Sequence, residues 1–357
     1  MKLEKLLKQY DYHVPPALIA QQPARPRDSA RLLVYDRKTK RVQFDIFRNL
    51  GKYLPARHAS PRGIAGGPPK AMLVFNQTKV IPARLTLTKL SGGKVRVLYL
   101  ATEGKNIRVL ADRALSPTEI LKLSKHYTFT AVRRANNQWL LKPSFPISQL
   151  KKVLDRFGVA PLPPYIKHSP LNETERKAQY QTVFAKRSGS VAAPTASLHF
   201  TKTLIAKLKR QGFGIQYVTL HVNLGTFAPL TSAQLKNKHL HREWYEVNDH
   251  TARAINEAKL QNRPIIAVGT TVVRTLESAV DKWGKIQSGA RETQLFIQPG
   301  YTLQVVNSLI TNFHVPKSSL MMLVASLTGR KPLLATYEEA KKAVFRFFSF
   351  GDGMLIR

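Results

Sequence analysis

Three histidines stand in segments where small, glycine or proline residues could bring the backbone close to a ligand. His199 lies in SVAAPTASLHFT, His221 in TLHVNLGTF and His314 in ITNFHVPKSSL. An imidazole titrates near neutral pH, so each ring could serve as an acid, a base or a hydrogen-bond donor. The competing interpretation is a structural histidine: it is favoured for His199 taken alone and as well supported as a ligand role for His221.

A fourth segment, IIAVGTTVVRTLES, runs from an apolar strand through Gly269, Thr270 and Thr271 directly into a helix. Hydroxyls and free backbone amides converge at such a helix start, which suits a polar or anionic ligand. Glu277 follows Arg274 by three residues on this helix, and we favour an ordinary salt bridge between them. If the pair is buried, Glu277 becomes a candidate general base with a shifted pKa.

The last candidate groups follow another predicted strand. Asn312 and His314 end it, Pro316 opens the next helix, and Lys317 is suited to a phosphate or carboxylate. Each of these segments is weak alone, but together they predict one composite pocket at the edge of an α/β sheet. We predict no metal site, because the pair His239 and His241 lacks a cluster of partner ligands.

Charge is the dominant property of the whole chain. The 357 residues include 57 Lys and Arg against 21 Asp and Glu, a formal net charge of +36. Such an excess attracts polyanions and favours a nucleic-acid partner. A generally basic proteome or an acidic protein partner would explain it as well. The chain has no cysteine, no apolar run long enough to span a membrane and a polar N-terminus, so we expect a cytoplasmic protein.

The predicted elements divide the chain into two domains. Short strand-like runs over residues 71–150 indicate a small all-β barrel. Helices and strands alternate after Pro161, which is typical of an α/β domain with a parallel or mixed sheet. We therefore expect a discontinuous α/β domain over residues 1–70 and 151–357, with the barrel inserted into it. The segment Pro55–Lys70, rich in Pro, Gly and Arg, is expected to be a linker.

The same segments resemble the S-adenosylmethionine:tRNA ribosyltransferase-isomerase family of queuosine biosynthesis. The resemblance covers nearly the whole chain in order and spacing. It is carried by the stretches DYHVPPALIAQQPARPRDSARLLVYD, MLVFNQTKVIPARL, PLPPYI, YQTVFAKRSGSVAAPTASLHFT, TLHVNLGTFAPL, HLHREWYEV, IAVGTTVVRTLES, FIQPGY, LITNFHVPKSSLMMLV and FRFFSFGDGMLI.

The resemblance implies a reaction. The ribosyl group of S-adenosylmethionine is transferred to 7-aminomethyl-7-deazaguanine at the tRNA wobble position and isomerised, giving epoxyqueuosine-tRNA, adenine and methionine. S-adenosylmethionine is then a consumed cosubstrate, with no tightly bound cofactor and no metal, and we expect a monomer. Our mechanistic hypothesis is that a base removes a proton beside the sulfonium, adenine leaves, the amine attacks the sugar, and methionine departs as the epoxide closes.

Roles follow from the match between these segments and the family motifs. We expect His199, His221 and Glu277 to be catalytic. We expect the cosubstrate to be bound by Gly269, Thr270, Thr271, Asn312 and His314. The expected tRNA phosphate contacts are Lys186, Arg187 and Lys317.

Four residues depart from the family pattern. Gln77 replaces Asp, Arg96 replaces Glu, and Ser197 and Asn223 each replace Gly. A catalytically degenerate relative that acts as a tRNA-binding protein is the main alternative function. An unrelated nucleotide-dependent enzyme would require a phosphate-binding loop or a metal cluster, and the sequence shows neither.

Overall fold

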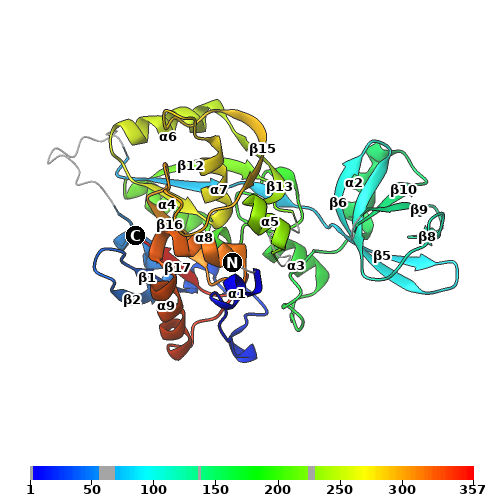
Figure 1. Cartoon of the computed structure of the whole chain (residues 1–357), viewed down its shortest axis with the longest axis horizontal. Coiled ribbons are helices and arrows are strands. Elements are labelled where there is room, and N and C mark those ends of the chain that lie inside the picture. Colours follow the sequence, from blue (N-terminus) through cyan, green and yellow to red (C-terminus); the bar gives the residue numbers. More distant parts are fainter. Residues whose placement is uncertain (1–2, 56–68, 136–137, 224–229) are drawn as a thin grey trace.

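The computed structural model describes residues 3–55, 69–135, 138–223 and 230–357. Within them the chain forms a large α/β domain and a separate β-barrel, which stands to one side of it in Figure 1. Both parts of the predicted fold class are thus confirmed. Most of the linker predicted over Pro55–Lys70 lies outside the described residues, as does Gly225 of the TLHVNLGTF segment.

A nine-stranded mixed sheet forms the centre of the α/β domain among the described residues. Its four inner strands are parallel to one another, so their carboxyl ends meet at one edge. The spatial order is β15 (Gly289–Leu295), β13 (His239–Val247), β12 (Gly214–Leu220), β3 (Met72–Asn76), β14 (Ile265–Val268), β16 (Ser308–Asn312), β17 (Gly353–Ile356), β1 (Arg31–Tyr35) and β2 (Val42–Ile46).

Apolar residues on alternate positions of each inner strand face opposite sides of this sheet. In β3, Met72 and Val74 join one core, whereas Leu73 and Phe75 join the other. Both faces are therefore covered, as parallel strands require. The first face carries α6 (Asp249–Leu260), α7 (Thr270–Ala279), α8 (Ser319–Thr328) and α9 (Arg330–Lys342), and the second carries α4 (Lys202–Arg210).

Side-chain caps fix the starts of several helices. The Thr201 hydroxyl accepts a hydrogen bond of 3.0 Å from the backbone N–H of Leu204, as the sequence predicts for α4. Asn248 caps α6 in the same way, through the N–H of Thr251 at 2.8 Å. Each cap satisfies a donor that the helix leaves unpaired. The remaining helices are α1 (Leu3–Lys8), α2 (Leu150–Phe157), α3 (Glu173–Gln179) and α5 (Ser232–Asn237).

The barrel closes on itself with its own apolar core. All its strand pairs are antiparallel, and the helix α2 packs against the same core through Leu150, Val153 and Leu154. The strands, in order around the barrel, are β10 (Gln138–Pro143), β7 (Asn106–Ala111), β6 (Lys94–Glu103), β5 (Arg84–Lys89), β8 (Ile120–Lys122) and β9 (Thr128–Ala135).

The domain boundaries differ from those expected at residues 71 and 150. Met72–Asn76 is not a barrel strand but lies between β12 and β14 in the large sheet, because its side chains are apolar on both faces. Next, β4 (Thr78–Val80) pairs with β11 (Arg187–Ser190) in a small parallel sheet. The barrel and its helix therefore occupy residues 84–157, thirteen residues later at the start than expected.

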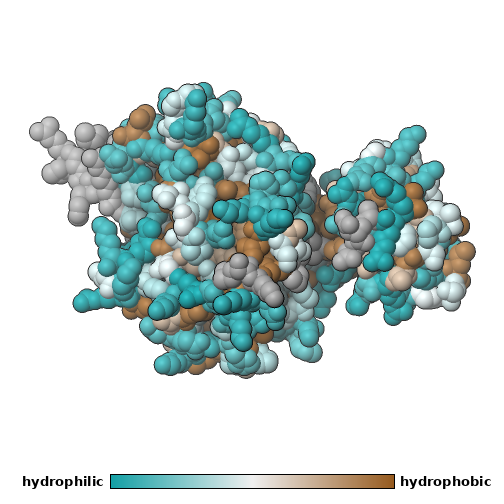
Figure 2. All heavy atoms as spheres, in the orientation of Figure 1, coloured by the Kyte–Doolittle hydropathy of each residue, from teal (hydrophilic) through white to brown (hydrophobic). Residues whose placement is uncertain are grey.

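The visible surface is mainly hydrophilic, as the high content of Lys and Arg predicts. Figure 2 shows hydrophilic residues predominating over both domains on this face, with scattered apolar residues between them. None of the helices in the described parts of the chain is both long and apolar enough to cross a membrane.

Candidate active site

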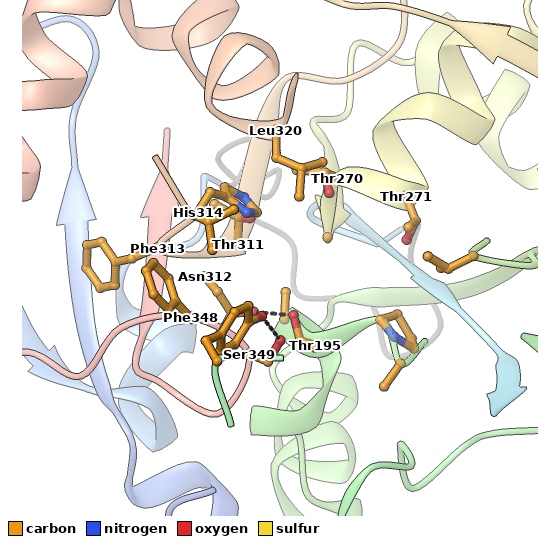
Figure 3. A pocket seen from close by; sticks show the side chains of 17 residues that line it. Thr195, Thr270, Thr271, Thr311, Asn312, Phe313, His314, Leu320, Phe348 and Ser349 are labelled. Atoms are coloured by element: carbon orange, nitrogen blue, oxygen red, sulfur yellow. Dashed lines mark hydrogen bonds between the residues drawn. The ribbon is translucent and has the colours of Figure 1, made fainter. Parts of the chain in front are cut away.

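The carboxyl ends of the inner strands surround a cavity. It holds about 600 Å³ of empty space, part of it open to solvent. Figure 3 shows side chains from several of these elements pointing toward it. All five residues predicted to bind a cosubstrate line this cavity: Gly269, Thr270, Thr271, Asn312 and His314.

One wall of the cavity is the start of α7. Gly269 has φ of +96° between β14 and the helix, a backbone conformation that favours glycine. This turn leads the chain straight from the strand into α7, so the hydroxyls of Thr270 and Thr271 and the first amides of the helix stand at the cavity. Helix amides there favour partial or full negative charge on a ligand.

The opposite wall includes Asn312, the last residue of β16. Its Nδ2 donates a hydrogen bond of 3.2 Å to Nε2 of His199, and its Oδ1 accepts one of 2.9 Å from the Thr195 hydroxyl. Both bonds fix the orientation of the amide. One N–H and one oxygen lone pair of Asn312 are not used by these two bonds.

His199 lies behind Asn312 and is not among the residues that line the cavity. Its ring is buried and lies 4.7 Å from that of Phe47. Burial lowers the pKa of His199 to about 4, so the ring is neutral near pH 7. With Nε2 as an acceptor, His199 orients the Asn312 amide.

His221 follows β12 at the same edge and is partly exposed. Its Nδ1 lies 2.8 Å from the Thr78 hydroxyl, and its ring stacks on Trp244 at 4.8 Å. Burial lowers the pKa of His221, against the opposite effect of nearby Glu246. His221, like His199, is not among the residues that line the cavity, but the adjacent Val222 is.

Glu277, the third residue expected to be catalytic, is held in the protein interior. It is buried on α7, where its carboxylate accepts backbone hydrogen bonds from Gln304, Val305 and Val306 at 2.8, 3.0 and 3.1 Å. It is not among the residues that line the cavity. These bonds fasten the loop before β16 to α7. The expected salt bridge between Glu277 and Arg274 is wrong, because Arg274 pairs with Glu243 of β13.

The expected tRNA-binding residues are on the surface near this edge. Lys186 and Arg187 are exposed, and Arg187 forms an ion pair of 3.5 Å with Glu246. Lys317 forms one of 2.8 Å with Asp11. These exposed pairs contribute little to stability and leave the cations able to exchange partners. No group of residues able to hold a metal occurs in the described parts of the chain.

Sequence reasoning missed Asn76, which ties three strand ends together. Its buried amide donates to the carbonyl of Leu220 at 2.9 Å and to the Thr271 hydroxyl at 3.3 Å. Its oxygen accepts from the amides of Leu220 and Thr78 at 3.1 and 3.0 Å. The available signal was a single amide at the end of the otherwise apolar run MLVFN.

An aromatic wall was also missed. Tyr165, Phe348 and Ser349 line the cavity, and the Tyr165 hydroxyl lies 2.6 Å from that of Ser349. Tyr165 and Phe348 have ring centroids 4.9 Å apart. Burial raises the pKa of Tyr165 to about 12, so it is a neutral hydrogen-bonding group at pH 7.

Of three residues that depart from the family pattern, two have side chains hydrogen-bonded within the described parts of the chain and one does not. Ser197 is fully buried, and its hydroxyl has no partner among the described residues. Asn223 donates from Nδ2 to the carbonyl of Arg242 at 3.1 Å. Gln77 donates to the Thr219 hydroxyl at 3.3 Å, and its carbonyl accepts from the amide of Lys186 at 2.8 Å. None of the three lines the cavity.

A protein family described as "Queuosine biosynthesis protein" matches residues 7–356 of this sequence. The chain belongs to this family. Two proteins similar to this chain are named S-adenosylmethionine:tRNA ribosyltransferase-isomerase. One, from Carboxydothermus hydrogenoformans, is 43% identical and the match covers 98% of this chain and 99% of the relative. The other, from Geotalea uraniireducens, is 41% identical with the same two coverages.

A crystal structure supports the same membership. It is that of an S-adenosylmethionine tRNA ribosyltransferase from Thermotoga maritima, 31% identical, with a TM-score of 0.55 over 98% of this chain and 100% of that chain. The resemblance found in the sequence is thus confirmed. The chain is a transferase-isomerase of the queuosine biosynthesis family that acts in tRNA modification.

Proposed function

We propose that the cavity binds S-adenosylmethionine while its ribosyl group is transferred to the wobble base of tRNA and isomerised. The observation that carries this proposal is the convergence of Gly269, Thr270 and Thr271 with Asn312 and His314 around one cavity. The products are epoxyqueuosine-tRNA, adenine and methionine. S-adenosylmethionine is consumed in each turnover, so it is a cosubstrate of this site and not a permanently bound cofactor.

Adenine is assigned to the Asn312 side of the cavity. An asparagine amide can pair with the N6 and N7 edge of adenine, accepting from N6 and donating to N7. The unused N–H and lone pair of Asn312 provide this combination, and His199 and Thr195 keep the amide from turning over. Donation to N7 stabilises negative charge on adenine as it leaves. The Tyr165 and Phe348 rings offer an apolar surface for the purine.

The sugar is assigned to the start of α7. The Thr270 and Thr271 hydroxyls can hydrogen-bond with ribose hydroxyls, and the first helix amides face the same space. Removal of a proton from the carbon beside the sulfonium leaves an electron pair on that carbon. The partial positive charge of the helix start stabilises developing negative charge in a buried site.

We assign the general base to His221. Of the three residues expected to be catalytic, it alone is partly exposed, since His199 and Glu277 are buried in hydrogen bonds to other parts of the chain. Its lowered pKa keeps the ring neutral and able to accept a proton near pH 7. Thr78 and Trp244 hold the ring in place.

The tRNA is assigned to the surface beside the same edge. Lys186 and Arg187 lead into the segment that lines the cavity, and Lys317 follows His314 and Val315, which line it. These cations would hold phosphates while the wobble base leaves its stack to reach the sugar. We propose that the chain meets its tRNA in the cytoplasm.

The proposal is tested by mixing the purified chain with S-adenosylmethionine and tRNA carrying 7-aminomethyl-7-deazaguanine. We expect release of adenine and methionine, and the mass of epoxyqueuosine in the digested tRNA. A chain that binds this tRNA but yields neither product would be the degenerate tRNA-binding relative, and the proposal would be withdrawn.

A further inference from the structure

A second, smaller cavity adjoins the first. It contains about 370 Å³ of empty space, part of it open to solvent, and Leu320 lines both cavities. The walls of the second cavity are partly apolar, through Ile297, Leu320 and Leu323. They also carry a buried ion pair between Arg274 and Glu243. This pair has no part in the function proposed above.

Among the described residues, one nitrogen of Arg274 has no hydrogen-bond partner. Its Nε donates to the carbonyl of Leu295 at 3.2 Å, and its Nη1 donates to the Glu243 carboxylate. Its Nη2 is buried and has no hydrogen-bond partner among the described residues. A buried donor of a charged group is costly to leave unpaired, so its position calls for an explanation, and a bound ligand is one that fits a donor in a cavity wall. Two fixed nitrogens hold the third in a defined direction.

Glu243 completes a pair of opposite charges on one wall. It is 2% exposed, and Oε1 accepts a hydrogen bond of 3.1 Å from the amide of Asn223. An α-amino acid presents a carboxylate and an ammonium group on the same carbon. A guanidinium beside a carboxylate is complementary to that arrangement.

The helix α7 connects this pair with the first cavity. Thr270 and Arg274 are four residues apart and therefore lie on the same face of the helix, one turn from each other. A ligand whose sugar lies at Thr270 could extend along this face to Arg274 and pass Leu320 on the way. The few bonds between the sulfonium and the carboxylate of S-adenosylmethionine match a step of one helix turn.

We propose that the second cavity binds the methionine end of S-adenosylmethionine, with the carboxylate on Arg274 Nη2 and the ammonium group beside Glu243. Ile297, Leu320 and Leu323 contact the methylene chain. This inference rests on the proposed function, because it assumes that the first cavity holds the sugar and adenine. Arg274 is then the residue that selects the complete cosubstrate over analogues without a carboxylate.

The first test uses the unaltered chain. Calorimetry compares the affinity for S-adenosylmethionine with that for decarboxylated S-adenosylmethionine, which keeps the sulfonium and the amine. A charge-assisted hydrogen bond in a buried site predicts that the decarboxylated compound binds at least about tenfold more weakly. Equal affinities would overturn the inference. This measurement needs no substitution, so it does not depend on the folding of a variant.

The second test removes the ion pair without leaving one charge alone. In the double variant Arg274→Gln, Glu243→Gln, and in Arg274→Lys, we expect the preference for S-adenosylmethionine to fall to about twofold or less, on the same hydrogen-bond reasoning. The matched control is Arg263→Gln with Glu257→Gln, another pair with a buried arginine and an unpaired Nε, whose members do not line either cavity. The control should keep the full preference. A double variant that keeps it as well would overturn the inference.

Failure of this inference differs from failure of the proposed function. If the first cavity does not bind S-adenosylmethionine, the unaltered chain binds neither compound and releases no adenine, and both proposals fall. If only the assignment of Arg274 is wrong, the unaltered chain still binds S-adenosylmethionine and releases adenine. The Arg274 variants then prefer S-adenosylmethionine over the decarboxylated compound as strongly as the unaltered chain does.

Discussion

The amide Nδ2 of Asn312 donates a 3.2 Å hydrogen bond to Nε2 of His199, and both side chains are buried. The bond joins the carboxyl end of β16 to the segment before α4, which lie 113 residues apart in the sequence. It fixes which edge of the amide faces the cavity. We therefore expect His199 to affect a ligand through Asn312, because His199 itself does not line the cavity.

This relationship predicts unequal effects of two substitutions. Asn312→Ala removes the group that contacts adenine, so we expect kcat/KM for S-adenosylmethionine to fall by about a hundredfold or more, as for loss of a transition-state donor. His199→Gln can still accept from Asn312 and should cost less than about tenfold, on the scale of one neutral hydrogen bond. Steady-state adenine release measures both. A larger loss in His199→Gln than in Asn312→Ala would give His199 a direct role.

The buried ring of His199 also predicts a pH dependence of stability. Its pKa is about 4 in the folded chain against 6.5 for a free histidine, so below pH 6.5 the unfolded chain binds the extra proton first. The free energy of unfolding should therefore fall as the pH is lowered from 6.5 to 4, by about 3 kcal/mol from this group.

Urea unfolding over this pH range measures the effect, with His199→Gln as the comparison. The variant should show a shallower loss of stability than the parent chain. Parallel curves for the two proteins would mean that His199 does not change its protonation on unfolding. Burial also lowers the pKa of His314 to about 4, so part of the decline should persist in the variant.

Glu277→Gln separates a structural from a catalytic carboxylate. The new amide would direct an N–H group at backbone N–H groups that now donate to the carboxylate, among them those of Val305 and Val306. We expect a loss of about 1–3 kcal/mol in the free energy of unfolding and little change in kcat below the melting range. Chemical denaturation and adenine release check this. Intact stability with abolished turnover would restore Glu277 as a catalytic residue.

The surface cations predict a salt-dependent loss of tRNA affinity. Arg187→Ala and Lys317→Ala should each weaken binding and reduce the slope of log K against log salt by about 0.7 to 0.9. Lys282→Ala is the control, because Lys282 is exposed beyond the far end of α7 from the cavity. Filter binding at several salt concentrations measures the slopes. Equal slopes for all three variants would place the tRNA elsewhere.

The position of the cavity could be predicted from the sequence because strand ends in a parallel sheet share one edge. Gly269, Asn312 and His314 each follow an apolar run, and this local signal led to the correct edge. Glu277 could not be assigned in this way. Its partners are backbone amides 27 to 29 residues later in the chain, and Arg274 pairs with a strand that only the tertiary fold brings near.

The barrel boundary was missed for a different reason. Short apolar runs such as Met72–Phe75 occur both in barrels and in the centre of parallel sheets. The unbroken apolar character of this run was the signal for a strand covered on both faces, and the alternating pattern of Arg84–Lys89 was the signal for the barrel. Asn76 escaped attention because one amide in a strand carries no periodic pattern.

The position of β3 has a consequence for the order in which the chain folds during synthesis. This strand pairs with β12 and β14, which emerge from the ribosome roughly 140 and 190 residues after it. The barrel needs only residues 84–157, so its contacts are local and complete much earlier. We expect the inserted barrel domain to fold first. The apolar strand β3, which precedes it, stays unpaired until β12 and β14 have been synthesised.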